Sequence, residues 1–144
     1  MKLSDFIVEF LEQNRVNTVF ELCGGSIIHL LDSLHKNKRI RIISMHHEQA
    51  AAIAAEGFAR SSGGIAVAMA TSGPGATNMI TGIASCFFDS VPSVFITGQV
   101  NTYEFKFAKQ VRQIGFQETD IVSIVKPVVK YAQLIDQPSK IRYC

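Results

Sequence analysis

The sequence predicts an α/β protein with a doubly wound parallel sheet flanked by helices. Short apolar runs typical of strands alternate with helical segments along the chain, which favours parallel strands joined by crossover helices. The run Ile65–Thr71 is almost continuously apolar, as expected for a strand covered on both faces. Glycine loops stand between several strands and the helices that follow them.

The first half of the chain predicts alternating helices and strands. The first helix should present an apolar face made by Phe6, Ile7, Phe10 and Leu11. In chain order we expect a helix capped by Ser4, a strand at Val16–Leu22, a helix opened by Gly24-Gly25-Ser26, a strand at Ile40–Met45 and a helix at His47–Arg60.

The second half continues the alternation, with the strand Ile65–Thr71 broken by Ser72-Gly73-Pro74-Gly75. A long polar loop is expected after the next strand. In chain order we expect a helix that ends at Phe88, a buried strand at Pro92–Thr97, a short helix around Glu118–Val125, a strand at Val128–Leu134 and one more helix that starts at Pro138.

Four unusual segments follow predicted strands. They are Gly24-Gly25, the Glu48 segment, Gly73-Pro74-Gly75 and Gly98-Gln99. In a parallel sheet the carboxyl ends of the strands meet at one edge, where ligands gather. The sequence therefore predicts a binding site at this edge.

Glu48 is the first candidate for chemistry, because it begins a helix made largely of alanine. A carboxyl group in dry surroundings can hold or pass a proton near neutral pH. We expect Glu48 at the carboxyl end of a central strand, in a largely apolar cleft near Gly73-Pro74-Gly75. The alternative is a solvated acid in a first helical turn, where the helix dipole favours negative charge.

The segment Ser72–Asn78 has the form of a glycine loop between a strand and a helix, which can bind an anion. It lacks both the Gly-Lys-Ser/Thr ending of a P-loop and the spacing of a dinucleotide fold. A simple tight turn would explain Gly73 and Gly75, but not Thr77 and Asn78 together.

Other reactive side chains give weaker signals. Adjacent residues point apart and no helical His partner follows, so His46 and His47 do not predict a metal site; we expect a structural role for His47 and a solvent or interface role for His46. The Ser and Thr hydroxyls near the edge lack a base at a motif-defined spacing, so the sequence does not indicate a serine hydrolase. Cys23 is expected to be a small buried side chain, since nothing nearby in sequence would activate its thiol.

Composition limits the class of protein. The 144 residues suit one domain, and 47% hydrophobic with only 18% charged residues indicates surface covered by another domain or subunit. A net charge of +2 and the lack of basic residues interleaved with aromatics argue against nucleic-acid binding, and the short basic cluster at 36–39 is explained by a helix end and loop. Three scattered cysteines predict neither disulfides nor zinc, and an intracellular, cytoplasmic protein is expected. We expect neither a signal peptide nor a membrane span.

A set of motifs follows along the chain in a fixed order: His47-Glu48-Gln49, Glu56-Gly57-Phe58-Ala59-Arg60, Thr71–Asn78 with Thr81-Gly82, Asp89-Ser90-Val91-Pro92, Thr97-Gly98-Gln99 and Phe116-Gln117-Glu118. In order and spacing they resemble the thiamine-diphosphate enzymes typified by acetolactate synthase. The resemblance covers residues 1–144 and implies the pyrimidine-binding domain of that family.

The resemblance implies thiamine diphosphate as cofactor, with Glu48 hydrogen-bonded to N1′ of its aminopyrimidine and with Pro74, Gly75 and Asn78 beside that ring. The cofactor serves as the electron sink when a 2-oxo acid is decarboxylated and its acyl group transferred. The resemblance implies four substrate-side residues, the last two in the facing subunit: Gly25, Ser26, Phe116 and Gln117. It also implies a second copy of the chain, in a homodimer or tetramer.

Departures from the family concern one loop and the length. The family usually has Gly at the position of Glu21 and Pro at that of Cys23, so the substrate is expected to differ. The Gly-Asp-Gly motif for magnesium does not occur, and any FAD would bind in a middle domain. We therefore expect a pyrimidine-binding domain truncated before its last helix and strand, inactive alone, with magnesium bound through a missing diphosphate-binding domain.

Two other functions stay open at this stage: a non-catalytic α/β dimerisation or binding module that retains the fold, and an unrelated α/β phosphate-binding protein. We expect the chain to self-associate near the helices Glu48–Arg60 and Ala76–Phe88. Both carry small residues that let helices approach closely: Ala51, Ala55, Ala59, Ala76, Gly82 and Ala84.

Overall fold

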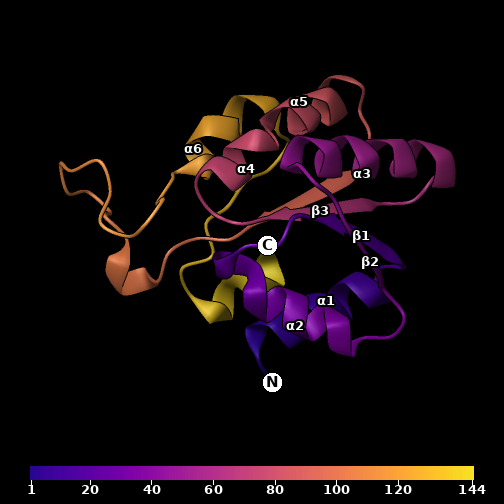
Figure 1. Cartoon of the computed structure of the whole chain (residues 1–144), viewed down its shortest axis with the longest axis horizontal. Helices are drawn as coiled ribbons and strands as arrows, with labels where there is room; N and C mark the ends of the chain where they lie inside the picture. The colour runs from indigo at the N-terminus through magenta and orange to yellow at the C-terminus, as the bar shows by residue number, and fades with distance from the viewer.

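One parallel sheet lies between two layers of helices in the computed structural model, which describes residues 1–144 (Figure 1). The strands are β1 (Thr18–Glu21), β2 (Arg41–Ser44), β3 (Ala66–Ala70) and β4 (Ser93–Thr97). Their spatial order is β2-β1-β3-β4, and every neighbouring pair is parallel. The doubly wound fold class is therefore confirmed.

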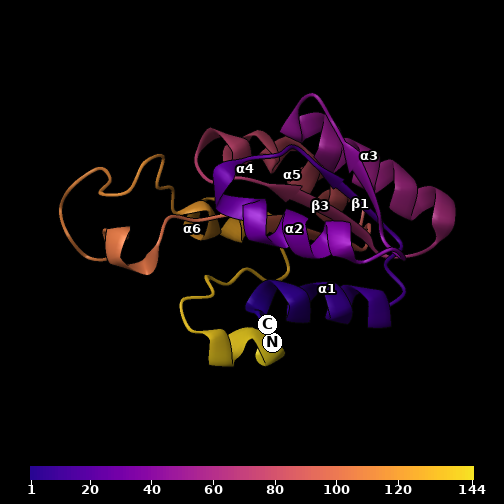
Figure 2. The same cartoon turned by 60° about the horizontal axis from the view of Figure 1, so that its bottom comes forward.

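Helices cover both faces of the sheet, as Figure 2 shows. One layer contains α1 (Leu3–Gln13) and α2 (Ile28–Lys36), and the other contains α3 (Glu48–Ser62), α4 (Pro74–Asn78), α5 (Ile80–Phe88) and α6 (Ile121–Val125). Short 3-10 turns are η1 (Gly25–Ile27), η2 (Thr102–Glu104), η3 (Lys126–Val128) and η4 (Pro138–Tyr143). The last turn returns to α1, where the Arg142 guanidinium lies 5.7 Å from the centre of the Phe6 ring.

Each central strand contributes side chains to two hydrophobic cores, because successive side chains point to opposite faces. Val19 and Val67 pack with Leu34 in the core under α1 and α2. Phe20 and Ala68 belong to the core under α3, α5 and α6. The near-continuous apolar run of β3 is thus explained by burial on both faces.

The alanines of α3 serve close packing inside the chain. A Cβ at Gly82 of α5 would lie 2.4 Å from Cβ of Ala52, so the two helices touch where glycine faces alanine. Ala51 and Ala55 are fully buried in the same core. Ala76 and Gly82 are buried as well and Ala84 is half-buried, so the chain's own sheet and helices cover most of the small residues expected between copies. Self-association near these helices stays a prediction.

The strand expected at Val128–Leu134 does not form. Val128 is the last residue of η3, and the residues after it do not pair with β4; Pro127 removes a backbone donor at the start of the segment. The strand β4 is an edge strand, half-buried rather than buried, because only β3 pairs with it. The helix expected to run to Phe88 is two helices, α4 and α5, that meet at Met79.

Three further expectations at the N-terminal side are wrong. Cys23, expected to be buried, is exposed in the loop that follows β1. Lys2, not Ser4, is the N-cap of α1; Ser4 is buried and receives a hydrogen bond from Ser33 Oγ. The buried face of α1 is made by Ser4, Val8 and Leu11, while Phe10 is 54% exposed.

Candidate functional site

The loops that follow the four strands lie at one edge of the sheet, as predicted, because all strands run in the same direction. Glu48, however, follows β2, which is an edge strand rather than a central one. The side chain still reaches the middle of the site, since α3 begins at Glu48 and crosses over β1 and β3.

Glu48 is a buried carboxylate, 9% exposed, held between two loops. His47 caps α3: its ring Nδ1 accepts a hydrogen bond of 3.1 Å from the backbone N–H of Gln49. This supports the structural role expected for His47, and His46 is exposed as expected. The Asn78 amide Nδ2 donates a 2.9 Å hydrogen bond to Glu48 Oε2. The interpretation of Glu48 as a solvated acid is thereby excluded.

Gly75 lies directly against this carboxylate. A Cβ at Gly75 would be 3.2 Å from Glu48 Oε1 and 2.7 Å from Thr71 Cγ2. The loop can pass so close only because residue 75 has no side chain. Oε1 accepts no hydrogen bond from the chain, so one carboxylate oxygen is satisfied by Asn78 and the other is available.

The Gly73–Asn78 segment has its shape set locally. Gly73 has a φ of 62°, and Pro74 occupies the first turn of α4, where its missing N–H costs nothing. The Thr77 hydroxyl donates to the Pro74 carbonyl, a local bond that explains Thr77 without a ligand. Asn78 instead reaches out of α4 toward α3, which no tight-turn requirement explains.

Gly25 and Ser26 lie beside this loop. Ser26 Oγ shares a 3.0 Å hydrogen bond with Ser72 Oγ, and the Ser26 N–H donates to Thr71 Oγ1 at 3.3 Å. These bonds tie the end of β1 to the end of β3. Gly25 is exposed, with no atom within 4 Å of the position that a Cβ would take.

Phe116 and Gln117 also come to the same edge, from a long loop. The ideal Cβ of Gly73 would lie 2.6 Å from Gln117 Cβ, so Gln117 packs on Gly73 of its own chain. Phe116 is 80% exposed. The Phe116–Gln117 segment therefore packs on the glycine loop of its own chain. These two residues reach the site without a facing subunit, in which they were expected to act.

The loop that carries Phe116 and Gln117 is organised by Glu118. Its carboxylate accepts hydrogen bonds from the backbone N–H groups of Lys106 and Ile114, at 2.7 and 2.9 Å. Burial works to raise the pKa of the Glu118 carboxyl, but the backbone N–H groups outweigh it and hold the pKa below its ordinary value.

Sequence reasoning did not foresee that Glu21 is buried. It is 2% exposed, the Ser44 hydroxyl donates to its Oε1, and its Oε2 is buried with no partner. Glu21 shares a face of β1 with Val19, which packs under α1 and α2, so it lies on the other side of the sheet from Glu48. The available signal was the acid at a position where the family usually has glycine.

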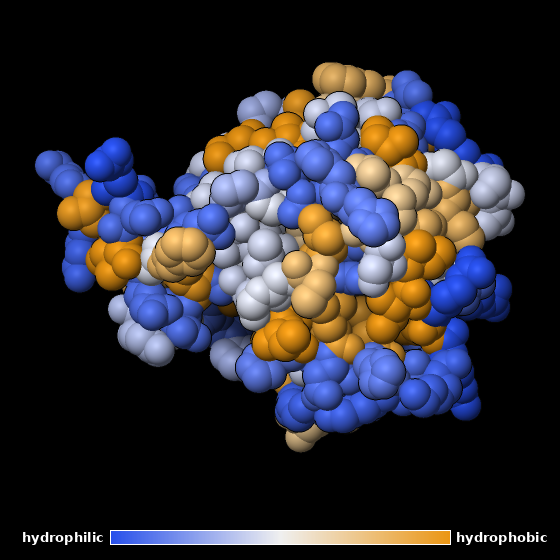
Figure 3. All heavy atoms as spheres, in the orientation of Figure 1, coloured by the Kyte–Doolittle hydropathy of each residue, from blue (hydrophilic) through white to orange (hydrophobic).

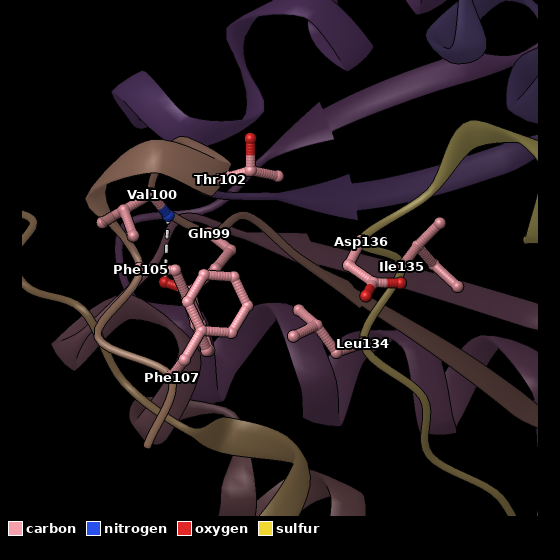
Figure 4. A pocket seen from close by; sticks show the side chains of 8 residues that line it. All are labelled: Gln99, Val100, Thr102, Phe105, Phe107, Leu134, Ile135 and Asp136. Atoms are coloured by element: carbon pink, nitrogen blue, oxygen red, sulfur yellow. Dashed lines mark hydrogen bonds between the residues drawn. The ribbon is translucent and has the colours of Figure 1, made fainter. Parts of the chain in front are cut away.

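A small cavity lies beside the edge but away from Glu48 (Figure 4). Two of its three polar side chains are already paired: Gln99 Nε2 donates to the Thr119 carbonyl, and Asp136 forms an ion pair with Lys140. The lining residues are Gln99, Val100, Thr102, Phe105, Phe107, Leu134, Ile135 and Asp136. We therefore take the Glu48–Gly75–Asn78 arrangement, and not this cavity, as the candidate site.

Two other structural features are absent from the chain. No three His, Cys, Asp or Glu side chains gather in a geometry that could hold a metal ion. No helix has the length and apolar character needed to cross a membrane.

Comparison with known proteins matches residues 1–124 to the family described as "Thiamine pyrophosphate enzyme, N-terminal TPP binding domain". Among similar proteins, acetolactate synthase 3, chloroplastic, from Brassica napus is 43% identical over 137 residues, covering 93% of this chain and 20% of the relative. Acetolactate synthase isozyme 1 large subunit from Escherichia coli is 43% identical over 132 residues (92% and 22%). A probable acetolactate synthase large subunit from Methanocaldococcus jannaschii is 40% identical over 141 residues (98% and 23%). The chain spans about a fifth of the length of these relatives.

Proposed function

Because this chain belongs to the thiamine pyrophosphate enzymes, as their N-terminal TPP-binding domain, we propose that it binds the aminopyrimidine of thiamine diphosphate in an acetolactate synthase-like enzyme. The substrate class is a 2-oxo acid, which is decarboxylated and whose acyl group is transferred. The observation that carries this proposal is the free Oε1 of buried Glu48 beside the bare backbone of Gly75.

The residues at this edge fit an aminopyrimidine. Glu48 offers one carboxylate oxygen that the chain leaves without a donor, which suits a ring nitrogen that carries a proton. Gly75 and exposed Pro74 form a surface without side-chain obstruction beside that oxygen. A side chain at position 75 would fill this space.

When bound, thiamine diphosphate would supply the electron sink that decarboxylation of a 2-oxo acid requires. The chain's part is to orient and to move a proton. Glu48 Oε1 would hold a proton at the ring nitrogen N1′, and the buried position of Glu48 limits the access of water to its carboxylate. Pro74 and Gly75 orient the ring.

The substrate side is assigned to the loop ends that face the same edge. Gly25 leaves open space, and Ser26 is fixed by Ser72 and Thr71. The side-chain amide of Gln117 makes no hydrogen bond within the chain, so it is free to bind a carboxylate or carbonyl of the substrate. Exposed Phe116 would cover the substrate from the loop side.

The diphosphate and its magnesium are assigned to residues outside this chain, since the relatives are about five times as long. A flavin, if used, would also bind outside it. We further propose a second copy of the chain as partner, in a homodimer or tetramer. Ile53 on α3, with Phe87 and Phe88 on α5, is exposed, and Figure 3 shows apolar patches over the upper helices.

Titration calorimetry of the complete native protein with thiamine diphosphate and Mg²⁺ tests the proposal. We expect saturable binding, and exchange of the cofactor's C2 hydrogen for deuterium that falls about a hundredfold or more in Glu48→Gln. Glu9→Gln, which makes the same change on the exposed side of α1, should leave both unchanged. No binding would contradict the proposal and favour the non-catalytic module; binding with normal exchange in Glu48→Gln would overturn the role of Glu48.

A further inference from the structure

The hydrogen bond between Asn78 and Glu48 joins two helices that start from different loops. Glu48 is the first residue of α3, and Asn78 is the last residue of α4. Asn78 Nδ2 donates to Oε2 at 2.9 Å. This is the one hydrogen bond that any side chain of the chain donates to the Glu48 carboxylate.

The bond gives the two carboxylate oxygens of Glu48 different roles. A glutamate side chain has three rotatable bonds, so an unrestrained carboxylate would sample several orientations. With Oε2 held by Asn78, the remaining oxygen is turned toward Gly75, where a Cβ would meet it at 3.2 Å. Oε1 is thus the oxygen presented to a ligand, and its direction is set before the ligand binds.

Asn78 is itself held in place by the fold. Its helix is short and is preceded by the N-cap Gly73, whose backbone conformation other residues rarely adopt. Ala76 and Met79, on either side of Asn78, are buried in the core shared with α3. The carboxamide therefore reaches Glu48 from a fixed backbone rather than from a flexible loop.

We propose that Asn78 is a positioning residue for Glu48, and that it acts through the carboxylate instead of contacting the cofactor. This inference rests on the proposed function and replaces the expectation that Asn78 binds the ring. A neutral amide donor suits this role, because it orients the carboxylate without adding a positive charge that would compete for the proton.

Asn78→Leu removes the donor but keeps a side chain branched at the same carbon, and Asn78→Asp keeps the shape but places a second carboxylate beside Glu48. The control is Asn37→Leu, because Asn37 Nδ2 also donates to a glutamate, Glu12 Oε2, at 2.7 Å on the other side of the sheet. Asn37 Oδ1 in addition accepts from the backbone N–H groups of Arg39 and Ile40, so this variant also loses two turn contacts. All variants are made in the complete native protein.

The first measurement needs no cofactor. In ¹H–¹⁵N spectra of the ligand-free protein, the side-chain amide signals of Asn78 should move when Glu48 is changed to Gln, and those of Asn37 should not. If the Asn78 amide signals are unaffected by Glu48→Gln, the hydrogen bond is absent and the proposal is overturned.

The second measurement separates positioning from binding. In Asn78→Leu we expect the affinity for thiamine diphosphate with Mg²⁺ to stay within about threefold, while C2 exchange at saturation falls about tenfold or more, as for a misplaced reacting group. A lower affinity with normal exchange at saturation would overturn the proposal, because it indicates a direct contact. Failure of the unaltered protein to bind thiamine diphosphate would instead refute the proposed function, while the amide spectra still decide whether Asn78 holds Glu48.

Discussion

Gln117 packs so closely on Gly73 that no side chain fits at position 73. A Cβ at Gly73 would lie 2.6 Å from Gln117 Cβ and 2.9 Å from the Gln117 carbonyl oxygen. Both residues have positive φ angles, 62° and 55°. The loop that contains the proposed pyrimidine site and the loop that contains Phe116 are therefore assembled as one unit. A substitution in one loop should therefore alter the conformation of the other loop.

Gly73→Ala should destabilise the protein and displace the Phe116–Gln117 segment. The backbone strain costs about 1–3 kcal/mol, and overpacking against Gln117 costs a similar amount. Urea unfolding measures the loss. Gly64→Ala is the control, since a Cβ at Gly64 meets only Ser62 Oγ at an ordinary 3.5 Å; an equal effect in both variants would contradict the proposed packing.

The sequence was sufficient to predict the alternation of strands and helices, since apolar runs and glycine loops are local signals. It also predicted that Glu48 and Gly75 lie at the same edge of the sheet, because the carboxyl ends of parallel strands meet there. It could not order the strands, and so placed Glu48 after a central strand. Nor did the apolar residues Val128–Leu134 reveal that no neighbouring strand would pair with them.

Some motif residues have a structural explanation that only the coordinates reveal. Arg60 donates to Glu56 at 2.6 Å and also pairs with Asp89, at the end of α5. The two pairings hold the pKa of the Arg60 guanidinium above its usual value, with the bond to Glu56 as the larger cause. The Glu56–Arg60 and Asp89–Pro92 motifs are therefore one ion-pair network that joins α3 to α5, and not part of the candidate site.

Gly24 and Gly25 should respond oppositely to alanine. A Cβ at Gly24 would lie 2.3 Å from Thr71 Cβ, whereas one at Gly25 meets nothing within 4 Å. Gly24→Ala should lower the free energy of unfolding by about 1–3 kcal/mol. Gly25→Ala should leave stability unchanged or slightly higher, yet reduce turnover of 2-oxo acids.

Chemical denaturation and steady-state kinetics on the two variants distinguish these effects. A destabilised Gly25→Ala would mean that the fold itself needs this glycine. Full activity in Gly25→Ala would remove Gly25 from the proposed substrate side.

Glu118 should make the Lys106–Ile114 loop sensitive to acid. The folded-state pKa of Glu118 lies below its ordinary value of 4.5, so its contribution to stability is present above that pH and is lost as the pH falls through the lower folded-state pKa. Glu118→Gln should be less stable than the unaltered protein at neutral pH, and the difference should shrink as the pH falls below 4.5.

Unfolding by urea at a series of pH values from neutral to acidic measures this difference. Glu104→Gln serves as the control for a carboxylate in the same loop region, where Glu104 accepts from the backbone N–H of Asn101 at 3.3 Å. A difference between Glu118→Gln and the unaltered protein that stays constant with pH would show that the carboxylate charge does not hold the loop.

Gly57 should reveal whether a second copy covers α3. It lies in the middle of this helix and is exposed, with nothing within 4 Å of the position that its Cβ would take. In a monomer, Gly57→Ala should therefore raise the free energy of unfolding by about 0.5–1 kcal/mol, since alanine is the better helix former. If a partner helix packs on Gly57 and its exposed neighbour Ile53, the added methyl group should instead weaken self-association. Sedimentation over a range of concentrations decides between the two, and an unchanged dimer constant would place the contact elsewhere, on α5 with Phe87 and Phe88 as the next candidates.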